Sequence, residues 1–150
     1  MKASILLLVL CLLVPTIAVP QSKKIPVAVD HDGQDSIGRA VAFALKEAIR
    51  GSLGFVLVET NVKIPRIIIV AQSVDALVDS VKGRVSAIAF SIIYYRTNGP
   101  GVGIFLGITV QSCGPDIIEI CVKQVLPHID RAVDFLRRHD PDLWKTLRPE

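Results

Sequence analysis

Two long runs of residues limit what this chain can fold into, because both are rich in β-branched side chains that favour strands. Residues 65–71 are apolar on both faces, as in a central strand of a sheet. Residues 84–96 alternate strictly, with Ser86, Ile88, Phe90, Ile92 and Tyr94 on one face. The opposite face carries the small residues Ala87, Ala89 and Ser91, so we expect a helix to approach closely there.

The remaining elements can be read from periodicity and from turn residues. Asn98-Gly99 predicts a hairpin turn, and Pro127 predicts a kink or a break in a long helix after Gly114. Further strands are expected at 25–29, 55–59 and 104–112, and helices at 37–50, 74–82 (following a cap at Ser73), 115–139 and 140–147. The order β-α-β-β-(α)-β-β-α predicts an α+β two-layer sandwich. Its sheet would be mixed, mostly antiparallel and of about five strands, with helices mainly on one face.

The first 18 residues have the pattern of a signal peptide. A basic start is followed by an apolar run from Ile5 to Val14, and Thr16 and Ala18 supply the small residues that precede a cleavage site. A permanent membrane anchor is the alternative, but Pro15 and Pro20 leave a short apolar core. We expect a signal peptide at 1–18, a single α/β domain at 19–139, a short helix or tail at 140–150, and a secreted or periplasmic location.

Charge gives little information about partners. The whole chain has 17 Lys and Arg against 14 Asp and Glu, a formal net charge of +3, and only 5% aromatic residues. Nucleic-acid binding is typified by a basic stripe with interleaved aromatics. The sequence has neither, so we expect no nucleic-acid partner.

The best cluster of chemical groups is the segment from Asp30 to Asp35, which we expect to form a turn. Asp30, His31, Asp32 and Asp35 could hold a hard cation or act as acid and base in a small hydrolase. An EF-hand loop needs Gly at its sixth position and Glu at its twelfth. Counted from Asp30, those positions hold Asp35 and Val41, so the segment does not match. A solvated turn with a helix cap at Asp35 or Ser36 explains the same residues, so we expect no cofactor, no metal and no catalytic residue here.

Two cysteines, Cys113 and Cys121, remain after cleavage in a compartment that permits oxidation. A helix beginning at Gly114 would hold them about 10 Å apart, which is too far for a bridge. A helix beginning near Ile117 would let them meet, and we favour this disulfide over two free thiols.

The carboxyl-terminal tail offers a third kind of site. Leu143, Trp144 and Leu147 could bind a partner protein or pack back on the domain, and Arg137-Arg138-His139 lie near a helix carboxyl end. Beyond the cleaved leader, weak contact of this tail is the only membrane contact we expect.

The segment from Ile25 to Glu59, with Ile37-Gly38 opening a helix and Gly54-Phe55 leading a second strand, resembles the amino-terminal domain of TolB. Related envelope domains include the lipoprotein activators of cell-wall synthases. Strand Ser91 to Tyr95 and Cys113-Gly114 also resemble small secreted bacterial proteins of unassigned activity. The TolB-like resemblance implies a binding module. We therefore expect a non-enzymatic domain that binds an envelope or extracellular protein through a sheet edge or the tail.

Overall fold

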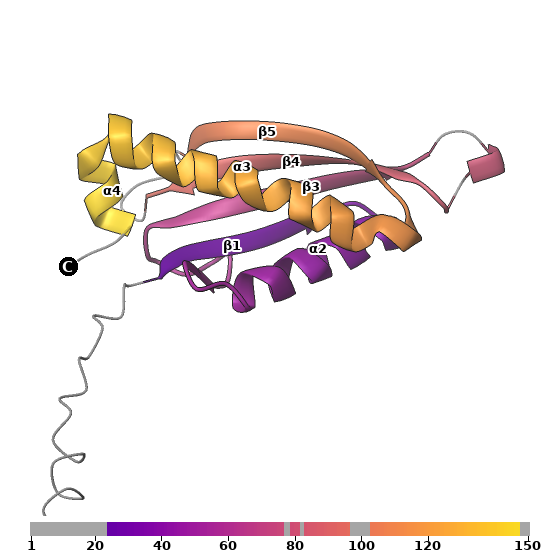
Figure 1. Ribbon diagram of the computed structural model, residues 1–150, viewed down its shortest axis with the longest axis horizontal. Coiled ribbons are helices and arrows are strands. Elements are labelled where there is room, and N and C mark those ends of the chain that lie inside the picture. Colours follow the sequence, from indigo (N-terminus) through magenta and orange to yellow (C-terminus); the bar gives the residue numbers. More distant parts are fainter. Residues whose placement is uncertain (1–23, 77–78, 82, 97–102, 148–150) are drawn as a thin grey trace, which may run out of the picture.

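The computed structural model describes residues 24–76, 79–81, 83–96 and 103–147 (Figure 1). The expected signal peptide and the Asn98-Gly99 turn lie outside these ranges. Within them, no helix is both long enough and apolar enough to span a membrane.

Five strands form one mixed sheet in the order β2-β1-β3-β4-β5. Its central strand, β3, pairs with β1 in parallel and with β4 in antiparallel orientation. The edge strand β2 is parallel to β1, and β5 is antiparallel to β4. The strands span Ile25–Asp32 (β1), Phe55–Leu57 (β2), Arg66–Asp75 (β3), Ser86–Tyr95 (β4) and Gly103–Cys113 (β5). The α+β prediction is confirmed, and the two antiparallel pairings are the longer ones.

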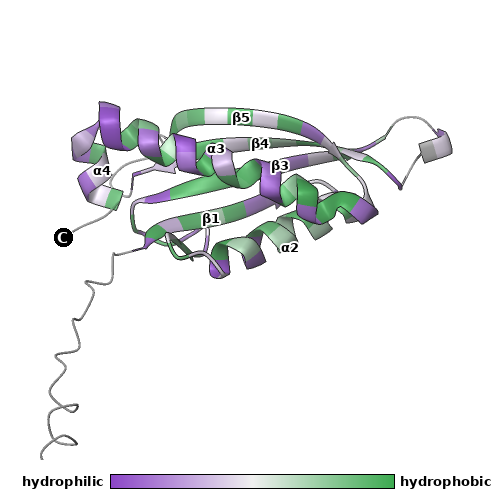
Figure 2. Ribbon diagram, in the orientation of Figure 1, coloured by the Kyte–Doolittle hydropathy of each residue, from purple (hydrophilic) through white to green (hydrophobic). Residues whose placement is uncertain are grey.

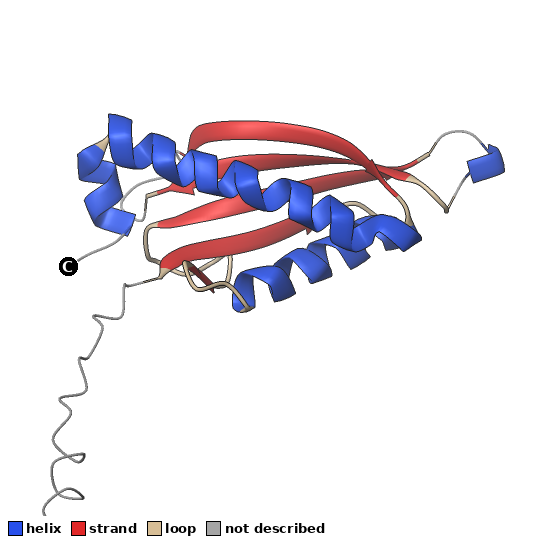
Figure 3. Cartoon of the chain, in the orientation of Figure 1, coloured by secondary structure: helices blue, strands red, loops and turns tan. Residues whose placement is uncertain are grey.

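The two long helices pass over the same face of the sheet, as Figures 1 and 3 show. The helical elements are α2 (Ser36–Arg50), η2 (Asp79–Val81), η3 (Pro115–Ile117), α3 (Ile118–His139) and α4 (Pro141–Leu147). In Figure 2 the helices alternate between hydrophilic and hydrophobic colours, as expected of helices that bury one face. The fold therefore has two layers, and among the described residues no long helix covers the other face of the sheet.

Alternation along the strands fills the space between the layers. The large side chains of β4 lie under the helices, with Ile88, Phe90 and Tyr94 fully buried and Ile92 1% exposed. From the helices, Val41 and Leu45 of α2 and Val125 and Ile129 of α3 reach the same core. The sequence had predicted a helix on the small face of β4, and that prediction was wrong. Burial of large apolar area outweighs the close approach that alanines permit.

Two local predictions need correction, and of the kink or break expected at Pro127 the break is absent. Residues 30–32 continue β1 instead of turning, and residues 73–75 continue β3 instead of capping a helix. Pairing extends both strands, because Asp32 lies opposite Gln72 and Asp75 lies opposite Ser86. The long helix α3 runs through Pro127 without a break. Its buried residues on both sides of the proline pack on one sheet, which outweighs the local cost.

The connection between β2 and β3 is held by a buried arginine. Arg66 is 6% exposed, and its guanidinium donates to the carbonyl oxygens of Thr60, Val62 and Ile64 while lying 5.2 Å from the ring of Tyr95. Three backbone carbonyl oxygens, rather than a carboxylate, accept hydrogen bonds from the Arg66 guanidinium. These bonds hold the loop between β2 and β3 in place.

Candidate functional site

The residues of the Asp30–Asp35 segment are divided between the two faces of the sheet. Successive side chains of a strand point to opposite sides. Asp30 and Asp32 therefore lie on the helix-free side of β1, whereas His31 lies on the helix side and reaches Ser73 of β3. Among the described residues, no group of three or more His, Cys, Asp and Glu side chains is placed to hold a metal ion.

His31 and Asp35 belong to a polar network with Ser73 and Ser86, neither of which the sequence places in a site. Ser73 and Ser86 both donate hydroxyl hydrogen bonds to the carboxylate of Asp35, the latter at 2.7 Å. The backbone N–H of Gly38 donates to the same carboxylate at 2.6 Å, which caps α2. The Nε2 atom of His31 lies 2.8 Å from the Ser73 hydroxyl oxygen.

These contacts determine which groups donate and which groups accept hydrogen bonds. Burial by itself raises the pKa of Asp35, but the hydrogen bonds from Ser73, Ser86 and Gly38 outweigh it and hold the pKa below its ordinary value of 3.8. The carboxylate is therefore ionised at neutral pH and accepts all three bonds. Since the hydrogen of Ser73 points to Asp35, His31 must donate to Ser73 through Nε2–H.

Because His31 donates to Ser73 and Ser73 donates to Asp35, Ser73 is not activated as a nucleophile. A serine nucleophile gives its proton to a histidine that a carboxylate orients. Here the serine stands between the two groups and is 6% exposed. The network therefore joins β1, α2, β3 and β4, and we assign it a structural role.

Gly38 allows the close contact at the centre of this network. A side-chain carbon there would overlap the Ser73 side chain and lie 2.8 Å from His31 Nε2. The absence of a side chain lets the first turn of α2 pack directly on β3. Ile37-Gly38 in the sequence is thus a packing feature as well as a helix start.

The two late cysteines form a disulfide, with Cα atoms 6.3 Å apart. The chain leaves β5 at Cys113, makes the 3₁₀ turn η3, and begins α3 only at Ile118. The helix thus begins close to Ile117, as a bridge between Cys113 and Cys121 requires. Both cysteines are buried, so the bridge joins β5 to α3 inside the core.

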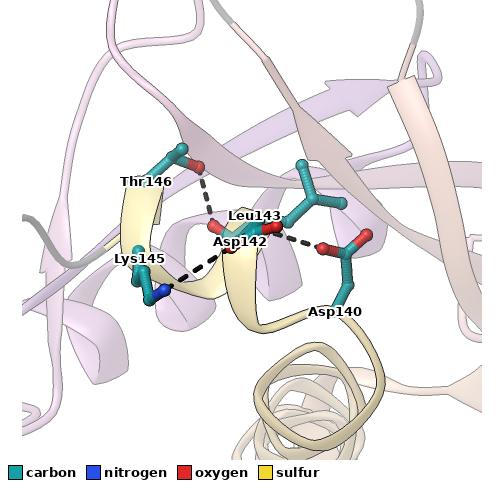
Figure 4. A network of polar contacts seen from close by, with 5 residues as sticks. All are labelled: Asp140, Asp142, Leu143, Lys145 and Thr146. Carbon is teal, nitrogen blue, oxygen red and sulfur yellow. Dashed lines mark hydrogen bonds and ion pairs between the residues drawn. The ribbon is translucent and has the colours of Figure 1, made fainter.

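The tail is docked on the domain. Leu143 is 9% and Leu147 1% exposed, and Trp144 is partly buried against the core. Figure 4 shows Asp140 accepting the backbone N–H of Leu143, and Thr146 donating to the Leu143 carbonyl. Thr146 also lies 2.7 Å from the Tyr94 hydroxyl. The structure assigns the two leucines to packing, and as long as α4 stays docked they are not presented to a partner.

The basic residues before α4 also have local partners. Arg137 pairs with Asp134 at 2.9 Å, and Arg138 donates to the Asp134 carbonyl. His139 stacks on Phe135 with ring centroids 4.5 Å apart. The pKa of His128, further back on α3, is lowered by burial and by the nearby Arg131.

The helix-free side of β3, β4 and β5 carries apolar side chains along all three strands. Strand register places on it Ile68, Val70, Gln72, Val74, Ala87, Ala89, Ser91, Ile93, Phe105, Ile108, Val110 and Ser112. We call these twelve residues the open face; Arg66, Tyr95 and Gly103 lie on the same side at one end of it. The exposed fractions are 58% for Phe105, 56% for Ile108, 66% for Val110 and 64% for Val74.

Strand β5 is patterned the opposite way from an ordinary edge strand. Its polar residues Thr109 and Gln111 lie on the helix side, where Gln111 donates to the Cys121 carbonyl at 3.0 Å. Three of its large apolar residues, Phe105, Ile108 and Val110, lie on the open face, whereas Ile104 lies on the helix side and Leu106 packs against the core. A register shift opposite Ile92 and Ile93 adds Leu106 and turns Phe105 to the same side as Ile108 and Val110.

Neither a protein-family model nor a curated protein matches this chain.

Proposed function

We propose that this chain is a non-enzymatic, extracytoplasmic protein-interaction domain that binds through the open face. The observation that carries the proposal is the pattern of β5, which exposes three large apolar side chains on the open face while Thr109 and Gln111 are half-buried on the helix side. Contiguous apolar patches on soluble proteins mark interaction sites. In this proposal, a partner covers the three side chains of β5 that the fold leaves exposed.

Two further features support the location and the class. The proposed signal peptide at residues 1–18 would export the chain, and a buried disulfide suits an oxidising compartment. The proposed kinship with TolB-type amino-terminal domains also implies a binding module. The sequence led us to expect contact through a sheet edge or the tail, and because Leu143 and Leu147 pack on the core we propose the open face of the sheet instead.

Site-specific photocrosslinking in the native envelope tests this function. A photoreactive residue at Ile108 is compared with one at Phe43, an equally apolar side chain that is 64% exposed on α2. We expect discrete protein adducts from position 108 and none of the same size from position 43. Equal adduct patterns from the two positions, or none from position 108, would reject the open face as the binding surface.

A further inference from the structure

We propose that the cavity between β5 and α3 binds a small organic anion, one that joins a carboxylate to a short apolar body. The residues that line it include Ile92, Leu106, Gly107, His128, Arg131 and Phe135. Ile108 of the open face borders it too, but the cavity lies between the sheet and α3, on the helix side. The inference is therefore independent of the function proposed for the open face.

The cavity is present because β5 has a glycine where a side chain would fill the space. Gly107 lies opposite Ile92 on the helix side of the sheet, and a Cβ atom at position 107 would meet no atom within 4 Å. Packing therefore does not require a glycine. The neighbouring register shift does not require one either, because a bulge calls for glycine only at a positive φ, which Gly107 does not have. A glycine inside a strand often marks a place where a ligand approaches closely.

Two basic side chains border this otherwise apolar cavity. His128 and Arg131 are three positions apart on α3, which places them on neighbouring turns of one flank. Arg131 donates through Nε to the Pro127 carbonyl at 3.3 Å, and no carboxylate among the described residues forms an ion pair with either basic group. The pKa of His128 is lowered by burial and then by the charge of Arg131, which agrees with their shared position on the cavity wall.

The acidic residues of the same helix lie elsewhere. At about 100° per residue, Asp130 and Asp134 fall on the flank of α3 away from His128, and Asp134 pairs with Arg137 at 2.9 Å. A ligand carboxylate therefore meets positive charge at the cavity without a competing anion. The planar guanidinium of Arg131 can donate two parallel hydrogen bonds to it, and a ring nitrogen of His128 can donate another.

The size and lining of the cavity limit the rest of the ligand. Its volume of about 280 Å³ is close to the lower limit of roughly 300 Å³ for small-molecule sites and equals that of roughly nine water molecules at about 30 Å³ each. Apolar side chains such as Ile92 and Leu106 favour an apolar body. A short-chain or single-ring carboxylate meets both conditions, whereas a long acyl chain exceeds the volume.

NMR titration of the exported protein, with its disulfide intact, tests the inference with hexanoate as the probe. We expect saturable shifts of the Gly107 and His128 amide signals, with a dissociation constant of about 1 mM or below. Two comparison compounds separate the two parts of the ligand. 1-Hexanol keeps the apolar body without the charge, inorganic phosphate keeps charge without the apolar body, and each should bind at least about tenfold more weakly than hexanoate.

Two variants locate the binding site. Arg131→Gln removes the charge at the cavity, and Gly107→Val places a side chain in the open space, so each should raise the dissociation constant for hexanoate at least about tenfold. The control Arg137→Gln removes the same charge from the other flank of α3 and should leave the constant within about twofold of wild type. Because Arg131 is exposed, its variant keeps the test decisive if Gly107→Val does not fold.

Three results would overturn the proposal. The first is the absence of saturable hexanoate shifts up to about 10 mM, a range that includes weak ligands of this size. The second is binding of 1-hexanol or phosphate as tight as that of hexanoate, since the site would then ignore the charge or the apolar body. The third is an unchanged dissociation constant in Arg131→Gln and in folded Gly107→Val, which would place the ligand outside this cavity.

Discussion

Asp35 is the residue on which the polar contacts of the amino-terminal half converge. It caps α2 and accepts from serines on β3 and β4, so one carboxylate joins three elements. A buried donor that loses its acceptor is costly, because no water replaces the lost bond.

Asp35→Ala should lower the free energy of unfolding by about 2 kcal/mol at neutral pH, through loss of the cap and of the two serine bonds. Urea unfolding followed by circular dichroism measures this change. Asp32→Asn removes the same charge from an exposed position outside the network and should leave stability within about 0.5 kcal/mol of wild type. Similar losses in both variants would contradict the role assigned to Asp35.

The lowered pKa of Asp35 also predicts a dependence on pH. Since the native pKa lies below the ordinary 3.8, the unfolded chain takes up the proton first in acid. The contribution to stability is therefore fully present above the ordinary carboxyl range and is lost as the pH falls through 3.8 towards the native pKa. Asp35→Asn cannot titrate, so its stability should fall less steeply between pH 5 and pH 3. If the stability of Asp35→Asn falls as steeply as that of wild type between pH 5 and pH 3, this assignment is contradicted.

Among the elements, α4 and β5 differ in where their apolar side chains lie. The leucines of α4 close the core beside Tyr94, with Thr146 at hydrogen-bond distance from the Tyr94 hydroxyl. Strand β5, by contrast, leaves Phe105, Ile108 and Val110 outside the core. The surface proposed for binding thus belongs to the sheet.

Leu147→Ala should destabilise the fold by about 3 kcal/mol, because it empties a fully packed position and leaves a cavity. The free energy of unfolding from urea denaturation gives the value. Lys145→Ala is the matched control on the exposed side of α4 and should change stability by less than about 0.5 kcal/mol. A Leu147→Ala variant as stable as wild type would show that α4 is not part of the core.

At the scale of the whole molecule, two helices cover one face of a sheet whose other face is apolar over three strands. Such a half-covered sheet is stable as a domain because its core lies between the layers. The helix-free face remains available for association, and the proposed export determines where that association takes place.

Export can be tested by the intact mass of the protein recovered from outside the cytosol. We expect a chain that begins at Val19 and that reacts with a thiol reagent only after reduction, because Cys113 and Cys121 are bridged. In the chain-entropy description, closing this short loop stabilises the fold by about 2.5 kcal/mol. A full-length chain in the cytosolic fraction, with both Cys113 and Cys121 reduced, would contradict the proposed location.

Much of the architecture could be predicted because it depends on local patterns. Alternation located the long strands, and the spacing of Cys113 and Cys121 restricted a bridge to a late helix start, which α3 has. The errors concern pairing. Residues 30–32 and 73–75 contain turn-forming or capping residues, and only the neighbouring strands make them extended.

The sequence by itself therefore determined where the long strands and helices lie and which two faces each long strand has, but not where β1 and β3 end. Tertiary structure decided which of those faces the helices cover, because burial depends on the total apolar area that two layers can enclose. It also gathered His31, Asp35, Ser73 and Ser86, which lie up to 55 positions apart, into one network. Neither result is contained in local spacing, since both arise only when distant strands pair.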